Sequence, residues 1–113
     1  MNVRNKKVCI MQGDEYPLYA SIFGETGNII TDQDVSQAEF IVGKRIRKVF
    51  PETVTFDKEK MQFVIPLKQA ETFSLQEGEA SVQVRVLFIT GEVSGGDAIP
   101  VFVKRSESKE VLK

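Results

Sequence analysis

The sequence contains no histidine and no tryptophan, and Cys9 is its only cysteine. Without histidine, the chain lacks the side chain that most often serves as a general base, as a zinc ligand or as the central member of a catalytic triad. A single cysteine cannot form a disulfide within the chain, so we expect Cys9 to pack as a small apolar residue. The sequence therefore predicts a protein that is not an enzyme and that holds no metal and no other cofactor.

A charge excess of either sign and long apolar runs are also missing. Fifteen basic and sixteen acidic residues leave a net charge of -1, so no overall field attracts nucleic acid or an anionic membrane. No apolar run approaches the roughly 20 residues that a membrane-spanning helix needs. No apolar segment typical of a secretory signal follows the polar start of the chain, and we expect synthesis in the cytoplasm. The 113 residues predict one domain, 1–113.

Period-two alternation, which is typical of β-strands, runs through most of the chain. Between Ala80 and Thr90 the predicted core-facing residues are Val82, Val84, Val86 and Phe88. The same test predicts strands at about 6–12, 15–23, 37–43, 45–50, 53–57, 61–67, 80–90 and 98–105. Turn-forming residues separate these strands, with a four-residue hairpin loop at Asp57 to Lys60 and a flexible glycine-rich hairpin loop at Gly91 to Gly96.

One segment, 68–73, alternates poorly and contains good helix formers, which predicts a single helical turn. Eight short strands with close turns favour a sandwich or a small barrel. Immunoglobulin-like folds place a helical turn at one sheet-to-sheet corner. We therefore expect an all-β, immunoglobulin-like antiparallel β-sandwich of about seven or eight strands, with one helical turn before the penultimate long strand. The charged tail, 106–113, is expected either to fray or to dock as a short helix.

The one basic cluster is Lys44, Arg45, Arg47 and Lys48, around Ile46. On a small barrel it predicts a strip that binds the phosphates of single-stranded nucleic acid. Strand alternation instead places Arg45 and Arg47 on the face opposite Lys44 and Lys48. The other interpretation is an edge strand that its charges protect from aggregation.

Acidic residues recur in predicted turns, and none of them forms a recognisable metal or catalytic motif. Asp32-Gln33-Asp34 resembles the start of a calcium loop, but Gln37 and Gly43 stand where such a loop needs a glycine and a glutamate. Turn and capping roles are the commoner use of such residues.

Several apolar residues fall on the faces opposite the predicted core. They are Leu87, Ile89, Phe102, Tyr19 and Phe23. A contiguous group of such residues marks a protein interface, whereas scattered ones need no explanation. We expect adjacent strands to bring Leu87, Ile89 and Phe102 together. The alternative is that the loop 24–36 or the tail covers them.

The sequence also resembles a known family over about residues 8 to 105. The resemblance rests on Gln12-Gly13-Asp14-Glu15-Tyr16-Pro17-Leu18, on Val35 to Phe40, and on Phe63-Val64-Ile65-Pro66-Leu67. A helical turn, Glu77-Gly78 and the strand Val82-Gln83-Val84-Arg85-Val86 complete it. Together these resemble the N-terminal immunoglobulin-like domain of phage baseplate upper proteins, and small structural proteins of prophages in Gram-positive bacteria.

The resemblance implies a non-enzymatic component of a virion or prophage particle, associated with the tail or the baseplate. Its partners are expected to be copies of itself or other phage structural proteins, with no membrane and no small-molecule substrate. The main alternative is a small β-barrel that binds single-stranded nucleic acid through 44–48. A third hypothesis is a carbohydrate-binding module, in which exposed aromatic rings stack on sugars.

Overall fold

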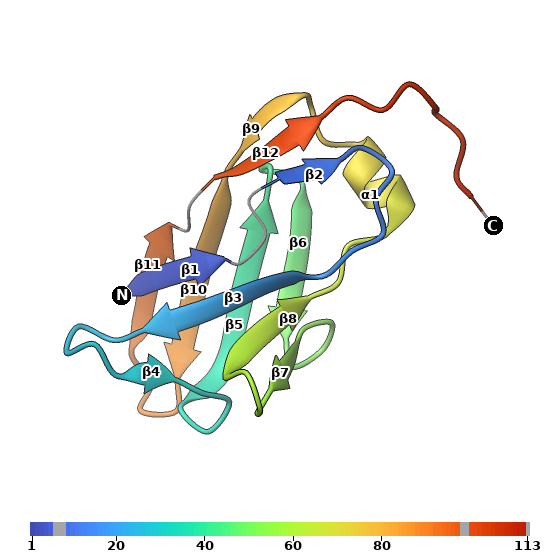
Figure 1. Cartoon of the computed structure of the whole chain (residues 1–113). Coiled ribbons are helices and arrows are strands. Elements are labelled where there is room, and N and C mark those ends of the chain that lie inside the picture. The colour runs from blue at the N-terminus through green and yellow to red at the C-terminus, as the bar shows by residue number, and fades with distance from the viewer. Residues whose placement is uncertain (6–8, 98–99, 113) are drawn as a thin grey trace.

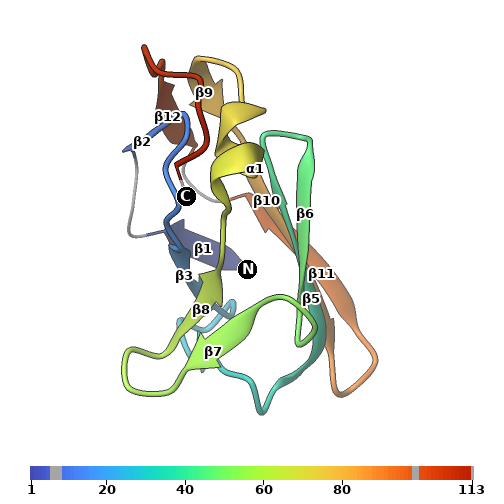
Figure 2. The same ribbon diagram turned by 90° about the vertical axis from the view of Figure 1, so that its right-hand side faces the viewer.

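Two β-sheets stack face to face in the computed structural model, which describes residues 1–5, 9–97 and 100–112 (Figures 1 and 2). The first sheet has the strand order β1-β3-β8-β7, and β4 also pairs with β3. Its strands are β1 (Asn2–Asn5), β3 (Leu18–Phe23), β4 (Ile29–Ile30), β7 (Thr55–Asp57) and β8 (Gln62–Ile65). The second sheet, in the order β11-β10-β5-β6, contains β5 (Val35–Val42), β6 (Ile46–Phe50), β10 (Val82–Phe88) and β11 (Val93–Asp97).

A small third sheet lies at one end of the sandwich, at the top of Figure 1. It consists of β2 (Cys9–Met11), β12 (Val101–Lys104) and β9 (Gly78–Ala80), in that order across the sheet. β12 pairs in parallel with β2 and antiparallel with β9. The one helix of the described chain, α1 (Gln69–Phe73), lies at the same end, between β8 and β9 in the sequence.

The strand order is that of an immunoglobulin-like sandwich. β1, β3, β8 and β7 correspond to strands A, B, E and D of such a domain, and β6, β5, β10 and β11 to strands C′, C, F and G. The short helix stands at the E–F corner, and only the three-residue strand β9 separates it from the long F strand in the sequence. This confirms the fold class predicted from alternation and from the single helical turn.

The core is aliphatic with an aromatic centre. The ring of Phe63 lies 4.8 Å from that of Phe56, 5.3 Å from that of Phe50 and 5.9 Å from that of Phe40, measured between ring centroids. Edge-to-face and tilted contacts of this kind add to the stabilisation from burial alone. The chain has no tryptophan and one cysteine, so its core contains neither the tryptophan nor the disulfide that are typical of antibody domains.

The predicted strand faces are correct wherever the structure describes them. Val82, Val84 and Val86 are buried, while Phe88 at the end of β10 is only half-buried. The predicted strands 6–12 and 98–105 extend over 6–8 and 98–99, which lie outside the described residues. The strand predicted over 80–90 is divided at Ser81 into β9 and β10, which belong to different sheets.

Three elements differ from the sequence-based expectations. β1 and the two-residue β4 were not predicted, because neither shows enough alternation to stand out. The flexible loop expected at Gly91 to Gly96 is wrong from Val93 onward, where β11 pairs with β10. Two glycines give this segment poor intrinsic strand propensity, and pairing along the whole of β10 overrides it.

The tail is neither helical nor without contacts over 106–112. The Gln69 side-chain amide donates to the Leu112 carbonyl and accepts from the Leu112 N–H, both at 2.8 Å. Gln12 Oε1 accepts from the backbone of Ser106 at 3.3 Å. The expected short helix is therefore wrong for these residues, because glutamine side chains bind the tail backbone in an extended form.

Candidate functional site

All five apolar residues proposed as an interface point away from the core. Ile89 is 65% exposed and Phe102 is 49% exposed, whereas Leu87, Tyr19 and Phe23 are half-buried. The strand neighbours of Tyr19 and Phe102, and Ile22 next to Phe23, are buried, as alternation requires. Leu87 lies between the buried Val86 and the half-buried Phe88, and Ile89 lies in the turn after β10. The faces were therefore predicted correctly, and the structure distributes these residues over three separate places.

The structure does not bring Leu87 and Phe102 together. Phe102 of β12 pairs with Glu79 in β9, whereas Leu87 of β10 pairs with Gln37 and Val93. The two strands belong to different sheets, and Leu87 lies at the end of β10 that is remote from β9 in the chain. The expectation that adjacent strands join them is wrong, because β12 pairs with β9 and not with β10.

Phe102 lies instead in an apolar patch on the outer side of the third sheet, which we call the end patch. Phe102 stands opposite Cys9 in the parallel pairing of β12 with β2, and Lys104 stands opposite Met11. Between them Ile10 and Val103 face the core, so Cys9, Met11 and Phe102 share the outer face. Met11 is 45% exposed. Met11 was not predicted, because a parallel pairing between strands so far apart in the chain leaves no local signal.

A second apolar group lies at the β10–β11 hairpin, at the other end of the domain (Figure 1). Leu87 stands opposite Val93, which is 60% exposed, and Ile89 follows in the turn. A shallow hollow of about 230 Å³ lies beside Leu87 and Val93, and Glu39 and Arg47 also line it. This group contains two of the predicted residues and adds Val93, which the loop interpretation had concealed.

Tyr19 and Phe23 lie on the outer face of the first sheet, where a cation stands over each ring. The Lys60 ammonium nitrogen is 5.2 Å from the Tyr19 ring centroid, and the Arg4 guanidinium is 5.6 Å from that of Phe23. Cation–π contacts of this kind occupy the ring face on which a sugar would stack. This arrangement gives no support to a carbohydrate-binding module.

The basic residues of 44–48 do not form a common strip. Lys48 points into the protein and is only 9% exposed, and Arg47, on the opposite face, binds Glu39 with an Nε–Oε2 distance of 2.6 Å. Arg45 donates to the carbonyl of Ser74 at 3.4 Å, and Lys44 stands in the preceding turn with φ 64°. Two of the four charges are therefore paired with carboxylates, and no observation favours the nucleic-acid hypothesis.

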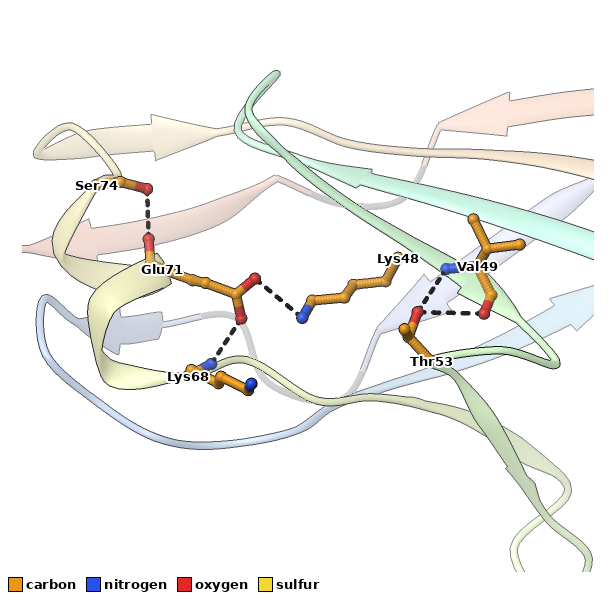
Figure 3. A network of polar contacts seen from close by, with 6 residues as sticks. All are labelled: Lys48, Val49, Thr53, Lys68, Glu71 and Ser74. Atoms are coloured by element: carbon orange, nitrogen blue, oxygen red, sulfur yellow. Dashed lines mark hydrogen bonds and ion pairs between the residues drawn. The ribbon is translucent and has the colours of Figure 1, made fainter.

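The inward Lys48 forms an ion pair that links β6 to α1 (Figure 3). Its ammonium nitrogen lies 2.9 Å from Oε2 of Glu71. The other carboxylate oxygen of Glu71 accepts from the backbone N–H of Lys68 at 2.9 Å, which caps the start of α1. Partial burial raises the pKa of Glu71, but the hydrogen bonds from Lys68 and Lys48 outweigh it, so the net pKa is below its usual value. This network is part of the framework that holds α1 in place.

The described residues contain no cluster of three or more histidine, cysteine or acidic side chains that could hold a metal ion. Asp34 of the calcium-like segment accepts hydrogen bonds from the backbone and the hydroxyl of Thr31. These hydrogen bonds stabilise the turn, and they use the Asp34 carboxylate within its own loop.

No protein-family model matches the chain, and a search of curated proteins gave no match. In the part of the chain that the structure describes, no helix is long and apolar enough to cross a membrane.

Proposed function

We propose that this protein is a non-enzymatic structural component that works through protein–protein contacts, and that it belongs to the tail or baseplate of a phage or prophage particle. The observation that carries the proposal is the end patch, in which Phe102 and Met11 are both nearly half exposed on an otherwise ordinary β-sandwich. Interface centres are enriched in aromatic residues and methionine and depleted in charge. The phage assignment rests on the family resemblance of the sequence.

The surroundings of the end patch suit a contact between proteins. Lys104 and Glu79, one basic and one acidic, lie beside Met11 and Phe102, which gives the polar rim that surrounds a typical interface centre. The patch is built on paired strands of the third sheet, so its residues keep their geometry without a partner. A partner can therefore bind without ordering the backbone first, which lowers the entropic cost of association.

The experiment that tests this proposal compares Phe102→Glu with Lys104→Glu. Both residues are exposed and lie on the same face of β12, so both variants should keep the wild-type circular dichroism and melting temperature. Binding is measured against the purified structural proteins encoded by neighbouring genes. Phe102→Glu should weaken it by at least about tenfold, the scale of a truncated hot spot, and Lys104→Glu should change it little. Equal binding by both variants would remove the end patch from the proposal.

A further inference from the structure

The described sheet edges differ in whether their backbone groups have partners. At the edge strand β6, Thr53 Oγ1 accepts from the N–H of Val49 at 2.9 Å and donates to the Val49 carbonyl at 3.2 Å (Figure 3). The N–H of Thr53 also donates to this carbonyl, at 2.7 Å. At the edge strand β2, Asp14 caps Met11. The Asp14 carboxylate accepts from the N–H of Met11, and the N–H of Asp14 donates to the Met11 carbonyl. Such caps prevent another strand from pairing there.

β11, the other edge of the second sheet, has no such cap among the residues that the structure describes. The N–H of Phe88 donates to the carbonyl of Glu92 at 2.9 Å, which identifies these two residues as a hydrogen-bonded pair of the β10–β11 hairpin. Hydrogen-bonded pairs alternate along an antiparallel ladder. The backbone groups of Val93 and Gly95 therefore point away from β10, toward the open edge, and no described residue bonds to them.

Nothing in the fold of the single chain requires a glycine at position 95. A Cβ atom there would lie 3.6 Å from the Val84 carbonyl oxygen, an ordinary contact, and the backbone is not in the left-handed region. Gly96 differs, because a Cβ there would meet the Met1 carbonyl oxygen at 3.2 Å. A glycine inside a strand costs roughly 0.5–1 kcal/mol relative to alanine. One recognised reason for tolerating that cost is the close approach of a second backbone.

We infer that β11 is a site of strand addition, and that its partner is β11 of a second copy of this chain, paired antiparallel about a two-fold axis. This inference deepens the proposed function, since it rests on the chain working through protein contacts. Main-chain hydrogen bonds between two open edges supply the affinity in this mode of association. The product is one continuous sheet that extends through both copies.

The two-fold arrangement fits the residues of β11. With Gly95 opposite its own counterpart, Val93 of each copy stands opposite position 97 of the other, so the same register serves both copies. Val93, which is 60% exposed in the single chain, is covered by the added strand. The caps on Met11 of β2 and Val49 of β6 occupy backbone groups that pairing with β11 would need, and β7 offers only three residues. β11 is the remaining long, open edge of the second sheet.

The test is a charge-exchange experiment at Gly95. Gly95→Lys places two lysines opposite each other, with Cα atoms about 5.5 Å apart in a hydrogen-bonded pair. We expect the wild type to sediment as a dimer and Gly95→Lys as a 12.7 kDa monomer. Gly95→Glu should also be monomeric, and a mixture of the two variants should restore the dimer. The control is Gln83→Lys. Gln83 is exposed and lies on β10, the strand next to β11, so this variant should dimerise like the wild type.

A Gly95→Lys protein that still forms the wild-type dimer would overturn the inference, as would a mixture that stays monomeric although both variants keep the wild-type circular dichroism. A wild type that is monomeric at every concentration would overturn it too. None of these results removes the proposed function, which is judged separately by partner binding of Phe102→Glu.

Discussion

The ammonium nitrogen of Lys48 lies 2.9 Å from a carboxylate oxygen of Glu71 and joins the edge strand β6 to the helix α1. Lys48 is 9% exposed, so the carboxylate of Glu71, rather than water, stabilises its charge. The Glu71 side chain is 29% exposed. The basic residue that the nucleic-acid hypothesis required at the surface is thus used inside the domain. Three stability predictions concern this end of the molecule.

Removing the Glu71 carboxylate should destabilise the protein more than removing the Lys48 charge. Glu71→Gln leaves the Lys48 ammonium buried without its counter-charge. Breaking a fully buried pair costs roughly 3–5 kcal/mol, and because Glu71 is partly exposed we expect about 1–2 kcal/mol here. Lys48→Met replaces the charge by an apolar side chain of similar length and should cost about 1 kcal/mol or less. Urea unfolding measures both, and a larger loss in Lys48→Met would contradict this account of the pair.

The contribution of Glu71 should depend on pH. Its pKa is lower in the folded chain than its usual value of 4.5, so the folded state binds fewer protons there than the unfolded state. The stabilisation is therefore complete above about pH 4.5 and is lost as the pH falls through the lower folded value. Urea unfolding of the wild type and Glu71→Gln should give a difference that shrinks below pH 4.5. If the difference in the free energy of unfolding grew on acidification, the pKa of Glu71 would be raised in the folded chain, contrary to this prediction.

The buried hydroxyl of Thr72 should matter more than its size suggests. Its Oγ1 accepts from the N–H of Gly13 and donates to the carbonyl of Asp14, both at 2.9 Å, so it holds the β2–β3 turn against α1. Thr72→Val keeps the shape and removes these bonds, which should cost about 1–3 kcal/mol. Thermal melting measures the loss, and Thr90→Val, at an exposed position, serves as the control. Equal melting temperatures for both variants would show that the hydroxyl is not needed.

Alternation along β10 predicts a sharp contrast between neighbouring positions. Val84 is 1% exposed, and Val84→Asp buries an unpaired carboxylate, which should cost roughly 4 kcal/mol or more and leave little folded protein. Gln83→Asp lies on the exposed face and should cost about 0.5 kcal/mol or less. Circular dichroism and thermal melting compare them. If the two substitutions proved equally harmful, the assignment of the two faces of this strand would be wrong.

Local patterns were sufficient to predict the sandwich, because β3 and β8 each bury one face completely, and β10 does so from Val82 to Val86. They were not sufficient for β11, whose glycines have no strand propensity of their own. The position of Phe102 shows the same limit at the candidate site. Its outward direction follows from alternation in β12, but its neighbour Cys9 is reached only through a parallel pairing across most of the chain.

If this protein acts by binding other protein chains, sedimentation velocity should detect the resulting complexes. The wild type is measured alone over a wide concentration range and then mixed with the purified structural proteins encoded by neighbouring genes. We expect species heavier than the 12.7 kDa monomer, with the mixed complexes lost in Phe102→Glu and retained in Lys104→Glu. A single 12.7 kDa species at every concentration and in every mixture would show that the protein does not act by binding these chains.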